Sequence, residues 1–242
     1  MTKACYVGVA GKARKVKKIY TGVANKARKV KKAYVGVGEK ARLFYSADQK
    51  LGYYGTVTGL SQGRDELAAT TVGDYGLFGG GADFIFGNSF FATVDAYTTS
   101  LVRSTPTALS KARSVLAAAT VGTYGLFGGG EFNNSYFATV DAYTTSLVRS
   151  TPTALSKARG SLAATTVGDY GLFGGSWAFG TNFTIVESAT VDAYTTSLVR
   201  STPTALSKAR GALAATTVGS YGLFGGGGAS NGLATVDVYN LV

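Results

Sequence analysis

The stretch ATVDAYTTSLVRSTPTALSKAR decides how this chain folds, because it occurs without change at 92–113, 138–159 and 189–210. A segment of the form LAATTVGDYGLFGG follows each copy, and its tyrosines stand 49, 46 and 51 residues apart, at Tyr75, Tyr124, Tyr170 and Tyr221. A period of about 45 to 50 residues with several short strands in each unit is typical of a β-propeller blade, whereas ankyrin-like helical pairs recur at about 33. We therefore predict an all-β propeller of four repeats.

Each unit can be divided into four strands. In the second unit, 116–121 is small and apolar, as a strand buried on both faces would be, and 124–127 is an aromatic run that glycines end. The third strand is expected at 139–143 and an edge-like fourth strand at 146–149. The last unit supplies only three strands, so we predict that 51–63 on the N-terminal side closes the last blade.

Three further positions recur in every unit: an Arg ahead of the first strand, a double glycine after the second and a Tyr in the third. They are Arg64, Arg113, Arg159 and Arg210; Gly79-Gly80, Gly128-Gly129, Gly174-Gly175 and Gly225-Gly226; and Tyr97, Tyr143, Tyr194 and Tyr239. With this pattern, residues 60–242 resemble the kelch repeat family, which implies a β-propeller. The fourth strand departs from the family, since Leu101, Leu147 and Leu198 stand where kelch repeats carry Trp.

Charge divides the chain in two. Residues 1–58 carry 14 Lys and Arg against two acids, a net charge of 14 − 2 = +12, whereas 59–242 carry 10 basic and 11 acidic residues, or −1. Such an asymmetry indicates segments with different partners. We therefore expect a basic attachment segment at 1–50 and the propeller at 51–242.

The basic segment has its own repeat of 14 residues, marked by Tyr6, Tyr20 and Tyr34. Its apolar residues keep a 4-3 spacing that is typical of a helical heptad. Several glycines oppose a helix, since each costs about 1 kcal/mol in a helix interior, and the Tyr-x-Gly-Val units favour strands. We predict short hairpins, with a helix as the alternative, and place the turns at Ala10-Gly11, Ala24-Asn25 and Gly38-Glu39.

Over residues 1–45, this array resembles the Tyr-x-Gly-Val-x-x-x-Ala-Arg-Lys-Val-Lys-Lys repeats of tail-associated structural proteins of phages and prophages of Gram-positive bacteria. The resemblance implies an attachment segment within a virion. We expect docking to an acidic protein surface, with nucleic acid as a second kind of partner that tyrosines could stack against; a charge that serves solubility alone is the further alternative. The docking residues would be Lys12, Arg14, Lys15, Lys17, Lys18, Lys26, Arg28, Lys29, Lys31 and Lys32.

Composition removes much of the commonest active-site chemistry. The chain has no histidine and a single cysteine, Cys5, which excludes catalytic His, His-containing zinc sites and intramolecular disulfides. The repeated Asp95, Asp141, Asp192 and Asp237 predict a structural role, because a catalytic centre needs unequal groups at one point. We expect no enzyme activity, no cofactor and no metal.

Carboxylates that do not repeat keep one enzymatic alternative open. A glycoside hydrolase needs two carboxyl groups in one cleft. The main candidates would be Asp65, Glu66, Asp83, Glu131 and Glu187.

The segments between the second and third strands differ in length and content while their flanks stay the same. They run 81–91, 130–137, 176–188 and 227–233. Loops on a rigid scaffold commonly carry binding, and aromatic residues suit a sugar or a protein surface; alternatively, these aromatics cap the propeller or pack between subunits. The expected contact residues are Phe84, Phe86, Phe90, Phe91, Phe132, Asn134, Tyr136, Phe137, Trp177, Phe179 and Phe183.

The favoured interpretation is a non-enzymatic phage virion protein of the tail, baseplate or surface decoration. It would meet other virion proteins or its own copies, and a host surface glycan is a further partner. No signal peptide and no membrane-spanning stretch is recognised, so we expect synthesis in the bacterial cytoplasm, a virion location and no membrane insertion. The alternative is a free carbohydrate- or protein-binding propeller whose arm binds nucleic acid or an anionic surface, and a glycoside hydrolase ranks third.

Overall fold

A computed structural model describes residues 6–9, 12–15, 20–23, 26–29, 32–37, 40–46, 51–85, 89–180, 182, 184–228 and 231–241, with side chains from residue 51 onward. Its regular elements, β1 to β25, are all strands, which confirms the all-β prediction. The chain divides into two compact units, Met1–Gly55 and Thr56–Val242.

The first unit contains three antiparallel hairpins, as the glycine content of the basic repeat predicts. The strands pair as β1 (Tyr6–Val9) with β2 (Lys12–Lys15), β3 (Tyr20–Val23) with β4 (Lys26–Lys29), and β5 (Lys32–Val37) with β6 (Lys40–Ser46). The three predicted turns lie outside the described residues, as do Lys17, Lys18 and Lys31. The other expected docking residues belong to strands: Lys12, Arg14 and Lys15 to β2, Lys26, Arg28 and Lys29 to β4, and Lys32 to β5.

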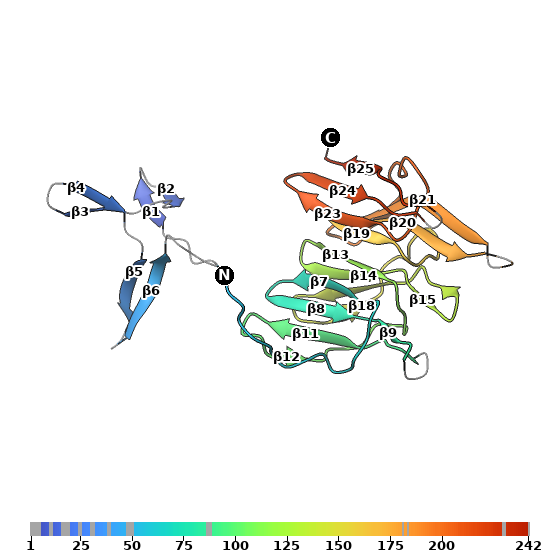
Figure 1. Cartoon of the computed structure of the whole chain (residues 1–242), viewed down its shortest axis with the longest axis horizontal. Coiled ribbons are helices and arrows are strands. Elements are labelled where there is room, and N and C mark those ends of the chain that lie inside the picture. Colours follow the sequence, from blue (N-terminus) through green and yellow to red (C-terminus); the bar gives the residue numbers. More distant parts are fainter. Residues whose placement is uncertain are drawn as a thin grey trace. The chain divides into compact units, whose positions relative to one another are not determined.

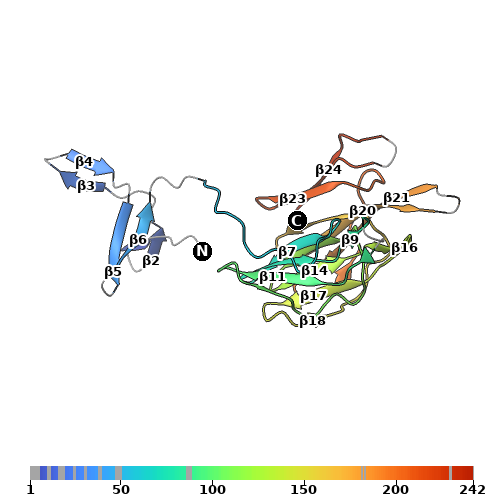
Figure 2. The same cartoon turned by 60° about the horizontal axis from the view of Figure 1, so that its bottom comes forward.

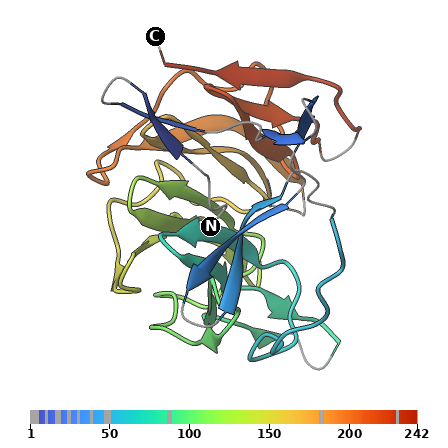
Figure 3. The same cartoon turned by 90° about the vertical axis from the view of Figure 1, so that its left-hand side faces the viewer.

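The second unit is a four-bladed β-propeller arrangement of antiparallel sheets, which confirms the predicted architecture (Figures 1 and 3). Blade 1 contains β7 (Ala68–Val72), β8 (Tyr75–Gly79), β11 (Val94–Thr98) and β12 (Arg103–Ser104). Blade 2 contains β13 (Ala117–Val121), β14 (Tyr124–Gly128), β17 (Val140–Thr144) and β18 (Arg149–Ser150). Blade 3 contains β19 (Ala163–Val167), β20 (Tyr170–Phe179), β21 (Ile185–Tyr194) and β22 (Arg200–Ser201). Blade 4 contains β23 (Ala214–Val218), β24 (Tyr221–Gly225) and β25 (Val236–Tyr239).

The fourth strands begin later than the sequence predicts. In blade 2 the strand is Arg149–Ser150 rather than 146–149. Leu147 has a φ of 61° and its N–H donates to the Thr144 carbonyl at 2.8 Å, so it occupies a tight turn ahead of the strand. The leucines expected at the kelch Trp position therefore lie in turns and not in strands.

The predicted closure of the last blade by residues 51–63 is wrong. Blade 4 has three strands, and its sheet receives no strand from residues 51–63. This segment contacts blade 1 instead: the Tyr97 hydroxyl donates to the Thr58 carbonyl at 2.8 Å, and the Ser61 hydroxyl donates to Asp95 at 3.1 Å. In blade 2, Thr107 and Ser110 make the same two contacts. The segment therefore repeats the role of the linker ahead of each blade, because TGLSQGR at 58–64 matches TALSKAR at 107–113.

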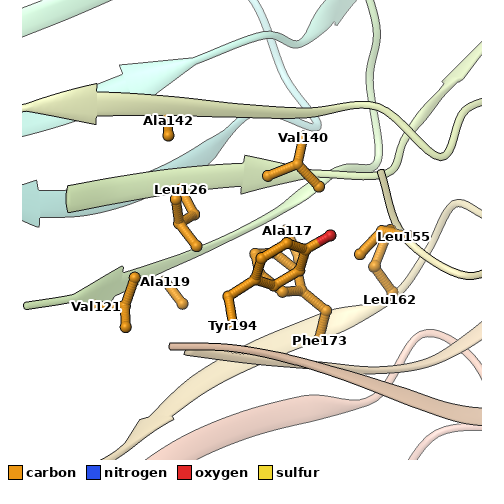
Figure 4. Close-up of a cluster of buried hydrophobic side chains, with 10 residues drawn as sticks. All are labelled: Ala117, Ala119, Val121, Leu126, Val140, Ala142, Leu155, Leu162, Phe173 and Tyr194. Atoms are coloured by element: carbon orange, nitrogen blue, oxygen red, sulfur yellow. The ribbon is translucent and has the colours of Figure 1, made fainter. Parts of the chain in front are cut away.

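The core lies between successive blades. Figure 4 shows the rings of Phe173 and Tyr194 from blade 3 directed toward the small and aliphatic residues of blade 2. The sheets approach closely because glycine faces each ring: a Cβ placed on Gly128 would lie 2.8 Å from Cε1 of Phe173. Burial of such rings, each worth about 1.5 to 3 kcal/mol, is the main stabilising term of the blade contacts.

Candidate functional site

The variable segments between the second and third strands gather at one side of the propeller, as Figures 1 and 2 both show. Blade 1 carries a short hairpin of β9 (Ala82–Asp83) and β10 (Ser89–Phe90), and blade 2 carries one of β15 (Glu131–Phe132) and β16 (Ser135–Tyr136). In blade 3, β20 and β21 themselves extend beyond a bulge between Gly174 and Ser176 to form the longest hairpin. The sequence therefore changes the loops while the repeated strands keep their positions.

Aromatic side chains link these hairpins across blades. The ring of Phe90 packs against Phe84 of its own hairpin at 5.9 Å between centroids and against Phe132 of blade 2 at 4.9 Å. The Phe179 N–H of blade 3 donates to the Tyr136 hydroxyl oxygen of blade 2 at 2.9 Å. The three loops thus form one continuous surface rather than separate fingers.

A hollow of about 110 Å³ lies at the centre of this surface and combines aromatic with acidic side chains. We call it the loop pocket, and its lining residues are Glu66, Phe84, Val115, Glu131, Asn134, Tyr136, Ser161, Trp177 and Phe179. Trp177 and Phe179 meet edge to face at 5.2 Å, which fixes one wall.

Three blades build the floor of the loop pocket with equivalent residues. Glu66, Val115 and Ser161 all have φ between 45° and 51°, a left-handed conformation that is uncommon outside glycine. The Val115 N–H donates to the Glu66 carbonyl at 3.0 Å, and the Ser161 N–H donates to the Val115 carbonyl at 2.9 Å. This run of backbone hydrogen bonds holds the three strained residues in place and aligns them at the pocket.

Two carboxylates give the pocket its negative charge. Glu66 accepts a hydrogen bond from the Ser114 hydroxyl at 2.9 Å. Burial raises the pKa of Glu131 above its ordinary value, the nearby Glu66 charge raises it further, and a hydrogen bond from the Asn134 backbone opposes both. Beside aromatic walls, the carboxylate oxygens can accept hydrogen bonds from sugar hydroxyl groups or pair with a cationic group.

The structure brings five of the predicted contact residues together, namely Phe84, Asn134, Tyr136, Trp177 and Phe179. Phe90 and Phe132 support the rim by packing on each other, and the Phe137 ring lies 4.7 Å from the Lys111 Nζ. Phe91 is half-buried and does not line the pocket. Phe86 and Phe183 lie outside the described residues.

Sequence reasoning missed the floor of the pocket, although it named Glu66 among the unrepeated carboxylates. A signal was present: each floor residue stands two positions after a repeated Arg, where the chain reads Glu66, Val115, Ser161 and Ala212. A variable residue within an otherwise constant frame marks a surface that the fold does not need for packing.

The repeated Arg and Asp residues lie in the frame, away from the loop pocket. Within every blade they form an ion pair of 2.7 to 2.9 Å: Arg64–Asp95, Arg113–Asp141, Arg159–Asp192 and Arg210–Asp237. Each Arg Nη2 also donates to the carbonyl of the Phe in the second strand. These pairs tie the linker ahead of a blade to its second and third strands, which is a structural role.

Neither a candidate metal-binding cluster nor a candidate membrane-spanning helix occurs in the part of the chain that the structure describes. His, Cys, Asp and Glu form no group of three there that could hold a metal ion. Within the same residues, no helix has the length and apolar character needed to span a bilayer.

The geometry defines the class of this molecule as a β-propeller with a loop pocket at one side. The chain is similar in fold to a solved structure described as "Structure of YjhT", with a TM-score of 0.61 and 11% sequence identity over 72% of this chain and 68% of that one. Comparison with known protein families finds no match, and no curated protein matches. At this level of identity the similarity concerns the fold alone.

Proposed function

We propose that this chain is a non-enzymatic binding protein whose propeller loops hold a sugar in the loop pocket. The observation that carries the proposal is the meeting of aromatic walls and carboxylates in one hollow, built by three different blades. Aromatic faces pack against the apolar face of a sugar ring, while a few fixed polar groups provide orientation.

The charge of the loop pocket determines which kinds of sugar it can bind. Glu66 and Glu131 both face the pocket, and none of the described residues that line it is a Lys or Arg. An acidic sugar would therefore meet repulsion, whereas a neutral or amino sugar would find acceptors for its hydroxyl or ammonium groups. We infer a preference in the order amino sugar, neutral sugar, acidic sugar.

We further propose that the protein is a structural part of a phage virion that docks through its basic hairpins. Support comes from the +12 charge of residues 1–58 and from the likeness of their repeats to those of tail-associated proteins. The described strands β2 and β4 each carry three of the expected basic residues. Under this proposal the hairpins hold the virion, and the loop pocket meets a glycan of the host surface.

Three sugars of the same ring test the binding proposal: glucose, glucosamine and glucuronic acid, titrated into the full chain and followed by isothermal calorimetry. We expect glucosamine to bind most tightly and glucuronic acid not at all. The Phe179→Ala variant should weaken binding at least tenfold, because the ring forms part of the pocket wall. Tyr170→Ala is the matched control, since Tyr170 is 37% exposed against 40% for Phe179, stands at the other end of β20 and does not line the pocket. Failure of all three sugars to bind, or equal loss in both variants, would overturn the proposal.

A glycoside hydrolase is the second candidate, which the pairing of Glu66 with Glu131 favours. A general acid of this class carries a raised pKa beside a second, ionised carboxylate, and the pKa of Glu131 is raised. Release of nitrophenol from nitrophenyl glycosides, abolished by Glu131→Gln, would establish hydrolysis in place of simple binding. Absence of release from a chain that binds sugars would exclude it for those substrates.

A further inference from the structure

In the part of the chain that the structure describes, two faces of the propeller are not covered by a neighbouring blade, whereas every internal face is. Each internal contact packs the small and aliphatic face of one blade against the Phe and Tyr of the next. The corresponding aliphatic face of blade 4, which we call the open face of blade 4, consists of Ala214, Thr216, Val218, Leu223, Val236 and Val238. The opposite kind of face is left uncovered on blade 1, and this open face of blade 1 consists of Ala69, Thr71, Gly76, Phe78 and Tyr97.

The open face of blade 4 exposes residues that are core elsewhere. Val236 is 56% exposed, whereas its counterpart in blade 2, Val140, is fully buried. A hollow of about 230 Å³ lies on this face beside Gly225. At the equivalent Gly174, a Phe ring of the next blade would be 2.7 Å from an added Cβ, while an added Cβ on Gly225 would meet only Val236 of its own blade.

The open face of blade 1 offers the matching ring. Phe78 and Tyr97 keep the edge-to-face contact of the internal blades, at 5.8 Å between centroids, yet both are only half-buried. Their counterparts Phe127 and Tyr143 have no exposed surface. No described residue lies within 4 Å of a Cβ added to Gly76, whereas the equivalent glycines of the internal blades each contact the preceding blade.

Hydrogen bonds show the same complementarity. At the internal contacts, a threonine hydroxyl donates to the threonine carbonyl of the preceding blade, as Thr217 does to Thr166 at 2.6 Å. By the same pattern, Thr71 of blade 1 would donate to a preceding blade, and the Thr217 carbonyl of blade 4 would accept from a following one. Over the described residues, neither of these two contacts is made.

Two backbone bonds extend the pattern. The Ala212 N–H donates to the Ser161 carbonyl at 2.9 Å and the Gly130 N–H to the Arg159 carbonyl at 2.9 Å, and each bond recurs at all three internal contacts. On blade 4, the Ala212 carbonyl and the Gly227 N–H stand at the positions that form these two bonds in the other blades. Within the described ranges, neither of them bonds to a following blade. On blade 1, the Glu66 N–H and the Arg64 carbonyl are the groups that would complete the same two bonds, and within the described ranges neither bonds to a preceding blade.

We propose that the open face of blade 1 in one copy of the chain docks on the open face of blade 4 in a second copy, with Phe78 against Gly225. The occupant is a second copy because blade 1 of this same chain supplies every complementary group: the ring, the hydroxyl, the amide and the carbonyl. Such an interface is heterologous, so it closes into a ring or continues as a filament. It does not depend on sugar binding or on the basic hairpins.

The test places one charge on each open face of the full chain. Gly76→Glu blocks the open face of blade 1, and Val236→Glu blocks that of blade 4; both sites are open in the single chain, so folding should be retained. Val148→Glu is the control, because this valine is 61% exposed in the turn before β18, away from both faces. Masses are measured by light scattering, and circular dichroism checks that each variant is folded.

We expect multimers for the wild type and for Val148→Glu, and monomers for each face variant alone. An equal mixture of Gly76→Glu and Val236→Glu should give dimers and nothing larger, because each copy retains one usable face. A monomeric wild type, or multimers that survive both face variants, would overturn the proposal. Sugar titration of the monomeric variants keeps this outcome separate from the loop pocket, which their substitutions do not touch.

Discussion

The Arg113 guanidinium and the Asp141 carboxylate lie 2.9 Å apart, Nη2 to Oδ2, and neither side chain has any exposed surface. Burial lowers the pKa of Arg113, and the attraction and hydrogen bond of Asp141 offset part of that effect. Arg149 adds a second ion pair to the same carboxylate at 2.8 Å. Among the described residues, Nε and Nη1 of Arg113 find no acceptor, while Nη2 donates to the Phe127 carbonyl and to Asp141.

Asp141→Asn should therefore destabilise the propeller by about 3 to 5 kcal/mol, the cost of leaving a buried charge without its partner. Asp237→Asn should cost less, because Asp237 pairs with a single Arg among the described residues and its side chain is 16% exposed. Urea unfolding of the two variants checks the order. Equal losses would show that burial of the pair is not what makes Asp141 important.

Gly128→Ala should destabilise by about 1 to 3 kcal/mol, as is usual when extra volume enters a packed core. The added Cβ would be 2.8 Å from Cε1 of Phe173, whose ring is fully buried. Gly225→Ala occupies the equivalent place in blade 4. When both substitutions are made in the monomeric Gly76→Glu variant, Gly225→Ala should cost much less, since its Cβ would meet only Val236 at 3.5 Å. Urea midpoints of these two otherwise identical substitutions give the comparison, and a loss at Gly225 as large as at Gly128 would contradict it.

Alkaline pH should destabilise the fold through its buried tyrosines. Burial raises the pKa of Tyr143 and of Tyr194, and it raises that of Tyr239 to about 12. A raised pKa in the folded state gives stability that is present below the unfolded pKa of about 10 and is lost as the pH rises above it.

Tyr143→Phe separates this effect from the hydrogen bond that the hydroxyl makes. At neutral pH the variant should be about 1 kcal/mol less stable, because the bond to the Thr107 carbonyl at 2.7 Å is lost. Between about pH 9 and pH 11 it should lose less stability than the wild type. Thermal melts across that range measure both, and parallel pH curves for the two proteins would rule out Tyr143 as a source of the alkaline loss.

Glu131→Gln should raise the melting temperature at neutral pH. Burial and the Glu66 charge raise the pKa of Glu131, so its contribution to stability is full below the unfolded pKa of about 4.3 and is lost as the pH rises through the folded value. The amide avoids this loss because it does not ionise. Melts at pH 7 and at about pH 4 should show a gap that closes on acidification; a gap that stays constant would mean that the charge of Glu131 is not its cause.

Much of the fold could be predicted from the sequence because the repeat exposes it. The period and the glycine-ended aromatic runs identified the blades, and the glycines of the basic repeat identified hairpins rather than a helix. The prediction that 51–63 closes the last blade was wrong, because TGLSQGR at 58–64 matches the linker TALSKAR that precedes each later blade. This segment therefore contacts blade 1 as a linker and adds no strand to blade 4. Leu147 was expected in the fourth strand but lies in a turn, because leucine rarely adopts the left-handed conformation and nothing in the sequence indicated it.

The loop pocket was only half predictable. Aromatic residues in variable loops indicated Trp177 and Phe179, since such residues are conspicuous against a constant frame. Val115 and Ser161 carry no chemical signal of their own, and only the register between blades brings them beside Glu66. The open faces could not be predicted, because their residues are nearly the same as the buried ones, with exceptions such as Val238 in the place of Ala142.

Equivalent residues form the contact between each pair of successive blades. Genetic change can therefore alter the number of blades. Recombination between two of the identical 22-residue copies would add or delete one whole unit of 46 to 51 residues. Every new junction would reproduce an existing one, with glycine against ring and threonine against threonine, so the chain could lengthen or shorten without passing through a badly packed intermediate. Stability in such an array grows roughly by a constant amount with each unit, which would let selection act on the loops of an added blade from the moment it arises.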